Sequence, residues 1–226
     1  MRQECPPSNP RPQGPKVRDS KAWKGMFSIS LTYVFVINTF LVIMKVSLLN
    51  RENTGLVIVD VQDKLMGVMG RKKEVIDNIV KLLHLSKIYN LPLILTEQYP
   101  KWLGPTVPEL KNSLPAYEPL NKLHFNCCDV EAFNNRLDSA NLKNIILTGV
   151  ESHICVFQTC FSLIERGYRV HVPQDAVDSR TEANWRVGLG LMGEKGAVIT
   201  STEAVIYQVL KKAGTKEFKE MLKIIK

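Results

Sequence analysis

Short apolar runs that alternate with helical patterns constrain the fold of this chain more than any other feature of its sequence. Residues 56–61 and 91–96 are apolar runs of strand length, and residues 73–89 between them carry apolar side chains at helical spacing. The alternation continues, with strands expected at residues 144–148, 169–172 and 197–200 and helices at 130–137, 155–167, 181–192, 204–212 and 216–225. Such alternation predicts an α/β fold, a three-layer sandwich whose mostly parallel, Rossmann-like sheet is covered by helices on both faces.

The first 44 residues differ in composition from the rest of the chain. Residues 1–25 are basic and rich in proline, with little apolar periodicity, and are expected to be disordered. Residues 26–44 are nineteen residues without a charge, a length that nearly crosses a bilayer core of ~30 Å. This segment can be a membrane anchor, an N-terminus foreign to the working protein, or a packed helix. The folded domain is expected to occupy residues 52–226.

The net charge of +8 is concentrated at the N-terminal end. Residues 1–51 hold eight of the 30 Lys/Arg and two of the 22 Asp/Glu, which leaves 22 against 20 for the remainder. Proteins that bind nucleic acid carry a basic stripe on the folded body. The near balance of charge after residue 51 therefore argues against a nucleic-acid partner.

The five cysteines are odd in number and lack the spacing of a disulfide framework or a CxxC pair. We therefore expect the cytoplasm or another reducing intracellular compartment, with a membrane-tethered form if residues 26–44 are an anchor. Cys127 and Cys128, near His124, do not suggest a metal site, because adjacent cysteines rarely ligate one ion and no second pair accompanies them. The sequence also lacks a Gly-x-Gly-x-x-Gly fingerprint for nucleotides.

Two local features complete the prediction of the fold. Residues 97–119 contain five prolines among other turn residues, so we expect an irregular loop that forms a rim over the strand ends. Asp129 is expected to be the N-cap of the helix at residues 130–137, because its side chain can accept from the first free N–H groups.

Three residues that lie after or between the predicted strands suggest nucleophilic chemistry. Residues 149–156 leave a strand at a glycine and begin a helix around Cys155, and helix N-termini stabilise a thiolate. Asp60 ends the first strand, and Lys122 closes the proline-rich loop. Because ligands bind at the carboxyl ends of parallel strands, the three side chains can face one crevice. Taken singly, they also suit a small buried hydrophobe, a turn residue and a solvated charge.

Three sequence blocks resemble those of a known family. Asp60-Val-Gln62, Lys122-x-x-Phe125 and Gly149-Val-Glu-Ser-His-Ile-Cys155-Val are similar to the signature blocks of the isochorismatase-like cysteine hydrolases. Further stretches are similar to the animal isochorismatase domain-containing proteins: Thr96-Glu-Gln-Tyr-Pro100 followed by Leu103-Gly-Pro-Thr-Val-Pro-Glu109, and Asp175-Ala-x-x-Ser-Arg180. The blocks occur in order and cover the chain from the first predicted strand onward.

The resemblance implies a mechanism in which Asp60 is the base, Lys122 its electrostatic partner and Cys155 the nucleophile. The thiolate attacks an amide carbonyl, ammonia leaves, and water resolves the thioester. Family members also carry a non-proline cis peptide, here Val150–Glu151, and the N–H groups of Glu151 and Cys155 would form an oxyanion hole. A small-molecule substrate and a homo-oligomer are expected by the same resemblance.

The resemblance implies neither a metal nor another cofactor. Nicotinamidases of the family bind a metal through an Asp-x-His motif and a further histidine, but no histidine occurs between His84 and His124, where that motif would lie. The family name does not fix the substrate either, because the substrate loop of this chain is of another type. Neither nicotinamide nor isochorismate is supported.

Five residues near the expected crevice are candidates for contact with the substrate, with loop packing as the alternative. They follow the first strand, the second strand or Lys122, and they are Gln62, Glu97, Gln98, Tyr99 and Phe125. His124 and His153 are expected to be structural or to face the substrate. Cys160 is expected to lie in the core.

Taken together, these features predict a cofactor-independent hydrolase in which a cysteine nucleophile acts on a small amide-like substrate. The alternative is a catalytically silent protein that keeps the fold and serves as a binding or scaffold module.

Overall fold

The computed structural model describes residues 48–225. The expectations for residues 1–25 and 26–44 lie outside this part of the chain. Within residues 48–225, no helix is both long enough and apolar enough to cross a membrane.

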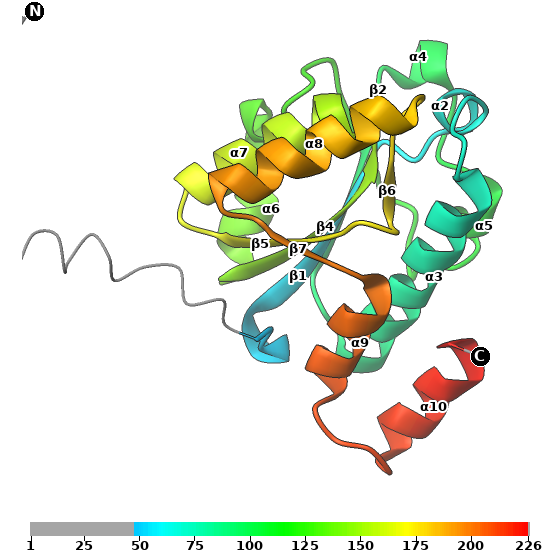
Figure 1. The fold of residues 1–226 in the computed structure, drawn as a ribbon, viewed down its shortest axis with the longest axis vertical. Coiled ribbons are helices and arrows are strands. Elements are labelled where there is room, and N and C mark those ends of the chain that lie inside the picture. Colours follow the sequence, from blue (N-terminus) through cyan, green and yellow to red (C-terminus); the bar gives the residue numbers. More distant parts are fainter. Residues whose placement is uncertain (1–47, 226) are drawn as a thin grey trace, which may run out of the picture. The chain divides into compact units, whose positions relative to one another are not determined.

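A parallel sheet of seven strands forms the centre of the described part (Figure 1). The strands are β1 (Thr54–Val59), β2 (Leu93–Gln98), β3 (Leu120–Lys122), β4 (Asn144–Val150), β5 (Arg169–Pro173), β6 (Val177–Asp178) and β7 (Val198–Thr200). Their order is β3-β2-β1-β4-β5-β7, and the short β6 pairs with the end of β4 beyond β5. β1 and β4, the two central strands, are buried along their whole length.

Helices cover both faces of this sheet. The helices are α2 (Asp63–Met66), α3 (Lys72–Tyr89), α4 (Pro100–Leu103), α5 (Pro108–Lys111), α6 (Glu131–Ser139), α7 (Phe157–Glu165), α8 (Glu182–Lys195), α9 (Thr202–Leu210) and α10 (Lys216–Ile225), with short turns η1 (Arg51–Asn53), η2 (Cys127–Asp129) and η3 (Ser152–Val156). Residues of α3, α9 and α10 belong to the core on one face, and residues of α6, α7 and α8 to the core on the other. The predicted fold class is confirmed.

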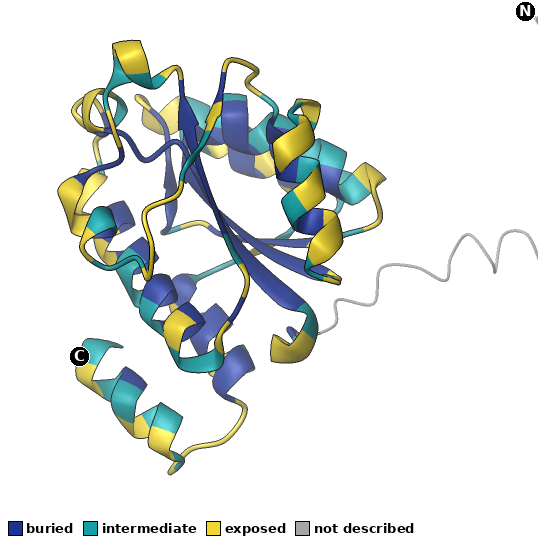
Figure 2. Cartoon of the chain, turned by 180° about the vertical axis from the view of Figure 1, so that it is seen from behind, coloured by how far each residue is buried: buried dark blue, intermediate teal, exposed yellow. Residues whose placement is uncertain are grey.

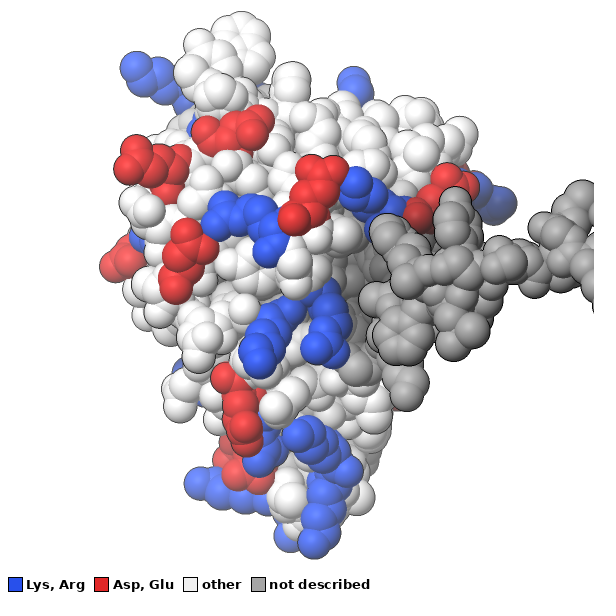
Figure 3. All heavy atoms as spheres, turned by 90° about the vertical axis from the view of Figure 1, so that its left-hand side faces the viewer, with Lys and Arg blue, Asp and Glu red and all other residues white. Residues whose placement is uncertain are grey.

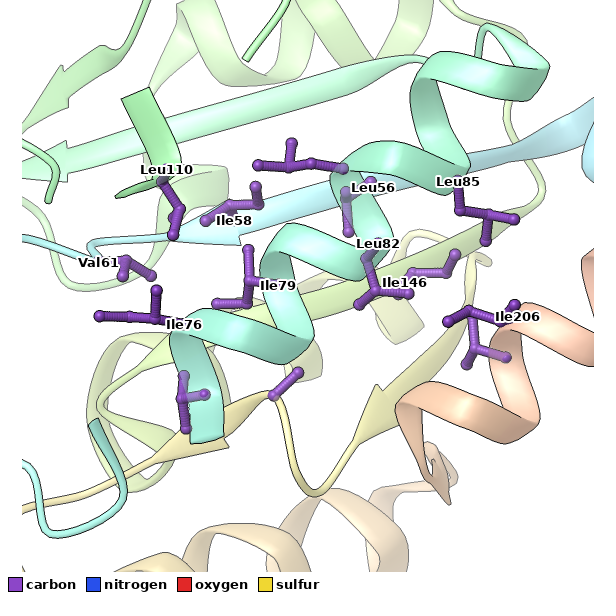
Figure 4. Close-up of a cluster of buried hydrophobic side chains, with 14 of the residues drawn as sticks. Leu56, Ile58, Val61, Ile76, Ile79, Leu82, Leu85, Leu110, Ile146 and Ile206 are labelled. Atoms are coloured by element: carbon purple, nitrogen blue, oxygen red, sulfur yellow. The ribbon is translucent and has the colours of Figure 1, made fainter. Parts of the chain in front are cut away.

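The two cores follow from the alternation of side chains along the strands. In β1, Leu56 and Ile58 face the α3 side, where they pack in one cluster with Ile79 and Leu82 (Figure 4). The next residue in β1, Val57, belongs to the opposite cluster, with helices α6, α7 and α8. Figure 2 shows the result: the central strands are buried, and the long helices that pack on them expose their outer faces.

The connections reverse direction between the two central strands. Helix α3 leads from β1 to β2 on one side, and α7 leads from β4 to β5 on the other. The region beyond the carboxyl ends of β1 and β4 is therefore a topological switch point, the place where open α/β sheets bind ligands. Asp60 follows β1 directly, and Cys155 lies five residues after the end of β4.

Residues 97–119 are more regular than the sequence predicted. Strand β2 continues to Gln98, and two short helices, α4 and α5, follow it. Pro100 and Pro108 occupy the first positions of these helices, where a missing N–H breaks no hydrogen bond. The prolines that suggested an irregular loop thus start the two helices.

The prediction that Asp129 caps α6 is wrong. The residue before α6 is Val130, whose side chain has no polar atom to cap the helix, and Asp129 lies one position earlier as the last residue of η2. The cap in this region is Asn126, whose side-chain oxygen accepts from the N–H of Cys128 at 3.0 Å and so begins η2. Asp129 in turn accepts from the Asn126 amide at 2.9 Å.

Candidate active site

Asp60 is a buried carboxylate at the end of the central strand β1. Its backbone is left-handed, with φ 54°, a conformation that aspartate tolerates better than most residues. One carboxylate oxygen accepts from the Thr96 hydroxyl at 2.7 Å, and the other accepts from the Lys122 ammonium at 2.6 Å. The side chain of Asp60 is 0% exposed and that of Lys122 is 1% exposed, so the ion pair is shielded from water.

Lys122 is the last residue of β3, and its ammonium is surrounded by acceptors. Besides Asp60, these are the side-chain oxygen of Gln98 at 2.8 Å and the carbonyl oxygens of His124 at 3.2 Å and Phe125 at 3.4 Å. An ammonium has three protons, so these four acceptors can satisfy all of them. The position of Lys122 is therefore fixed by the protein itself.

Burial and charge act against each other in this pair. Burial raises the pKa of Asp60 above its ordinary value, although Lys122 and Thr96 counteract the increase. Burial alone would lower the pKa of Lys122, but the charge and hydrogen bond of Asp60, together with the neighbouring Cys127 and Cys155, outweigh it and the pKa is raised. The lysine therefore stays an ammonium, while the carboxylate is a stronger base than an exposed aspartate.

Cys155 lies in η3, a single π-helical turn that leads from β4 into α7. The turn is held by the carbonyl of Glu151, which accepts from the N–H groups of Ile154 at 3.0 Å and Val156 at 3.2 Å. The peptide bond between Val150 and Glu151 is cis. Cys155 is 6% exposed and interacts with the nearby ion pair.

The pKa of the Cys155 thiol is raised, whereas the position at a helix N-terminus was expected to favour the thiolate. Burial raises its pKa, and the adjacent carboxylate of Asp60 raises it further, while Lys122 only partly compensates. The burial of Cys155 depends on contacts with residues distant in sequence, so it was not predicted. The arrangement is a neutral thiol beside a carboxylate of raised pKa, which suits proton transfer from sulfur to oxygen.

A glycine allows the strand that leads to Cys155 to approach the strand that leads to Asp60. Gly149 has φ 110°, and a Cβ at this position would stand 2.0 Å from the carbonyl oxygen of Val59. Any side chain at position 149 would therefore push β4 away from β1, just before the residues Asp60 and Cys155 that follow these strands. The glycine that marked a turn in the sequence thus sets the spacing of the site.

Residues just after β6 hold the turn that carries Cys155. The Ser179 hydroxyl lies 2.6 Å from that of Ser152 and 2.9 Å from the Nδ1 atom of His153. Arg180 donates twice to one carboxylate oxygen of Glu151, from its backbone N–H at 3.1 Å and from Nε at 3.0 Å. Sequence reasoning identified this block only by resemblance and missed β6, which is too short to show a period.

Three of the five candidates for substrate contact make internal hydrogen bonds. The Gln62 amide donates to the carbonyls of Gln98 at 3.0 Å and Gly104 at 2.6 Å, and it accepts from the Gln98 N–H at 2.8 Å. One carboxylate oxygen of Glu97 accepts from the N–H and hydroxyl of Thr106 and from the hydroxyl of Tyr117. For these residues, the alternative of packing within the protein describes their contacts.

Tyr99 and Phe125 are different, because both side chains reach solvent at the rim. Tyr99 is 48% exposed and Phe125 is 54% exposed. They flank the ion pair, since the Tyr99 N–H donates to the Lys122 carbonyl at 2.9 Å and the Phe125 carbonyl accepts from the Lys122 ammonium. Cys160 is fully buried in the core, as predicted. In the described part of the chain, no three His, Cys, Asp or Glu side chains gather as metal ligands would.

Comparisons with known proteins identify the family and the fold of this chain. The family model described as "Isochorismatase domain" matches residues 54–204. Isochorismatase domain-containing protein 2A of Mus musculus is 34% identical over 176 residues, which cover 77% of this chain and 84% of the mouse protein. The structure of the MAR1 ribonuclease from Caenorhabditis elegans is similar with a TM-score of 0.75 and 36% identity, covering 79% of this chain and 92% of the other.

A second solved structure is the YcaC gene product of Escherichia coli, described as an octameric hydrolase of unknown specificity. It is 26% identical, with a TM-score of 0.71, and the match covers 75% of this chain and 85% of the bacterial one. The family match supports a hydrolase and leaves the specific activity open. The match to the family model and the identity to the mouse protein show that this chain belongs to the isochorismatase domain family.

Proposed function

We propose that this protein is a cofactor-independent cysteine hydrolase that cleaves a C–N bond in a small amide-like substrate. The observation that carries the proposal is the buried ion pair of Asp60 and Lys122, 2.6 Å apart, beside the Cys155 thiol at the switch point of the sheet. Burying a charged pair costs several kcal/mol unless other bonds compensate, and such costly arrangements gather at functional sites. A nucleophile, a base and a fixed cation are the groups that acyl transfer requires.

The mechanism moves one proton between sulfur, carboxylate and leaving group. Asp60 takes the proton of the Cys155 thiol as the sulfur attacks the substrate carbonyl carbon. The tetrahedral oxyanion accepts from the N–H groups of Glu151 and Cys155, and one such donor is worth ~3–4 kcal/mol in comparable enzymes. When the C–N bond breaks, the amine leaves with the proton that Asp60 held, and an acyl thioester remains on Cys155.

Water then resolves the thioester. Asp60, again a carboxylate, takes a proton from a water molecule as its oxygen attacks the thioester carbonyl. The acid leaves, and the proton returns to the sulfur of Cys155. Lys122 stays protonated throughout and holds the carboxylate in place; general base catalysis of this kind contributes ~10²–10⁴-fold in rate.

The remaining features of the proposal rest on narrower observations. The octameric state of the bacterial relative supports a homo-oligomer for this chain as well. Four free cysteines in the described part, Cys127, Cys128, Cys155 and Cys160, support a reducing intracellular compartment. We propose residues 52–226 as the hydrolase domain, with Tyr99 and Phe125 as the substrate contacts at the rim.

RNA is the alternative substrate that the printed name of the nematode relative raises. A ribonuclease needs basic groups that follow the phosphate backbone. On the face drawn in Figure 3, acidic side chains lie among the basic ones, and residues 52–226 as a whole hold 22 Lys/Arg against 20 Asp/Glu. We therefore favour a small molecule and treat RNA cleavage as an outcome to be tested.

An ammonia-release screen over small primary amides tests the proposal. Wild type, Cys155→Ala and the matched control Cys128→Ala are assayed together, and circular dichroism checks their folds. Release by wild type and the control, lost in Cys155→Ala, supports the proposal. Release that persists in Cys155→Ala contradicts the cysteine mechanism. Folded protein that releases no ammonia favours the silent binding protein, and RNA cleavage by the same samples favours a nuclease.

A further inference from the structure

The last residues of β2 divide between the candidate site and the rim. Successive side chains of a strand point to opposite faces, so Thr96 and Gln98 share one face and Glu97 the other. Thr96 and Gln98 contact the two charged residues of the site, whereas Glu97 contacts Thr106 and the rim. The strand thus presents one polar side chain to each member of the ion pair.

Thr96 is arranged to donate to Asp60. Its hydroxyl is 2.7 Å from the carboxylate, and the thiol of Cys127 donates to the same hydroxyl at 3.9 Å. A hydroxyl has one proton, so an incoming donor leaves that proton for the carboxylate. Both residues are buried, and the Cys127 N–H donates to the hydroxyl of Thr159 at 3.0 Å, which anchors the thiol.

Gln98 is arranged to accept from Lys122. Its amide nitrogen donates to the carbonyl of Leu123 at 2.8 Å, which identifies the other atom as the oxygen that faces the ammonium at 2.8 Å. The backbone of Gln98 is held in turn by the amide of Gln62, which bonds both its N–H and its carbonyl. Leu123 therefore orients the side-chain amide of Gln98, and Gln62 holds its backbone.

We infer that Thr96 and Gln98 are positioning residues of the active site, Thr96 for the carboxylate of Asp60 and Gln98 for the ammonium of Lys122. This inference rests on the proposed function. Groups that face Asp60 come from four elements: Thr96 from β2, Lys122 from β3, Cys127 from η2 and Cys155 from η3. Of these, Thr96 is the neutral donor that favours the ionised carboxylate without taking part in the chemistry.

The test follows the rate at which iodoacetamide labels Cys155 across pH, with the label located by tandem mass spectrometry. Removal of the Thr96 hydroxyl disfavours the carboxylate, so the acid limb of the profile should move up by about one pH unit in Thr96→Val. Thr96→Ser keeps the hydroxyl and should stay within ~0.3 unit of wild type. The matched control is Thr148→Val, which removes a buried hydroxyl from the other neighbour of β1.

Gln98 has its own arm in the same experiment. In Gln98→Met the ammonium loses a neutral acceptor, and labelling at pH 7 should fall roughly tenfold. Gln208→Met, which alters an amide on α9 that accepts from Leu49, is the control and should label like wild type. This arm keeps the inference testable if Thr96→Val fails to fold.

The outcomes separate this inference from the proposed function. If Cys155 of the wild-type protein resists labelling at every pH, the proposed function fails, and the inference fails with it. If wild-type Cys155 reacts and the folded variants Thr96→Val and Gln98→Met keep its profile and rate, the inference alone is overturned. A shift shared by Thr148→Val also overturns it, because general damage to the strands would then be the cause.

Discussion

Gly188 of α8 lies directly against the backbone of Ser152, the first residue of the turn that carries Cys155. A Cβ at position 188 would stand 2.6 Å from the carbonyl oxygen of Ser152 and 2.9 Å from the nitrogen of His153. Backbone atoms cannot yield as a flexible side chain can, so only glycine allows this approach. The close packing of α8 thus fixes the position of the turn that carries the Cys155 thiol.

Gly188→Ala should therefore disturb the turn at Ser152–Val156 more than one added methyl group would elsewhere. We expect a loss of about 1–3 kcal/mol in the free energy of unfolding from overpacking, and a drop of at least tenfold in the labelling rate of Cys155. Gly190→Ala on the same helix is the matched control, because a Cβ there meets no atom within 4 Å. Urea unfolding and labelling kinetics measure both effects. Equal behaviour of the two variants would show that the contact does not matter.

Substitutions of Asp60 and Lys122 should have non-additive effects on the free energy of unfolding, because the two residues form a buried ion pair. Lys122→Met leaves the Asp60 carboxylate buried without its cation, and we expect a loss of about 3–5 kcal/mol in the free energy of unfolding. Asp60→Asn combined with Lys122→Met removes both charges and should be more stable than the single lysine variant. Urea denaturation of the two single variants and the double variant measures the coupling. Strictly additive losses would contradict it.

His171 should make stability depend on pH in the mildly acidic range. This residue of β5 is 1% exposed, neither ring nitrogen has a partner within the described residues, and burial lowers its pKa to about 4. Between pH 4 and the ordinary value of 6.5, the unfolded chain binds more protons than the folded one, so stability rises with pH.

The free energy of unfolding is therefore fully retained above pH 6.5, and protonation of His171 lowers it by on the order of 3 kcal/mol as the pH falls to about 4. His171→Leu should flatten the dependence between pH 4 and 6.5, while the partly exposed His84→Gln should leave it as in wild type. Thermal unfolding at half-unit pH steps measures this. An unchanged slope in His171→Leu would assign the acid sensitivity to other groups.

Glu97 should fasten the rim of the site. One of its oxygens accepts from Thr106 twice and from Tyr117, and this contact together with burial raises the pKa of Tyr117 to about 12. Hydrogen bonds to a charged group are worth ~1.5–3 kcal/mol each, so Glu97→Ala should loosen residues 99–119.

Limited trypsin digestion reads out this loosening. In Glu97→Ala, cleavage after Lys101 and Lys111 should accelerate several-fold, because both lysines lie in the segment that the carboxylate holds through Thr106 and Tyr117. Glu109→Ala, which changes an exposed carboxylate in α5, is the control. If both variants are cut as slowly as wild type, the rim is held by other contacts.

The sequence predicted the layers of this fold because short apolar runs that alternate with helical patterns indicate strands that helices cover on both sides. It did not predict β3 or β6, because the residues of β3, Leu-Asn-Lys, are mostly polar and the two residues of β6 are too few to show a period. Asp60 and Cys155 were located by their place after buried strands. The roles of Gln62, Glu97 and Gln98 were not predicted. In the sequence, a polar side chain at a strand end gives no sign of whether its partner is a substrate or another part of the protein, here Gly104, Thr106 and Lys122.

The state of the Cys155 thiol illustrates the same limit. A helix start and a lysine elsewhere in the chain indicated a thiolate, but burial and the carboxylate of Asp60 raise the pKa instead. Both causes depend on residues distant in sequence. The catalytic roles of Asp60, Lys122 and Cys155 remain a prediction that chemistry must test.

The most direct test is to trap the acyl group on Cys155. After rapid mixing with 4-nitrophenyl acetate, we predict a burst of one nitrophenol per chain and an acetyl group that mass spectrometry places on Cys155. The burst should vanish in Cys155→Ala and persist in Cys128→Ala, which removes another free thiol of the described part of the chain. A wild-type protein without a burst, a burst that survives in Cys155→Ala, or an acetyl group on another side chain would contradict the cysteine mechanism.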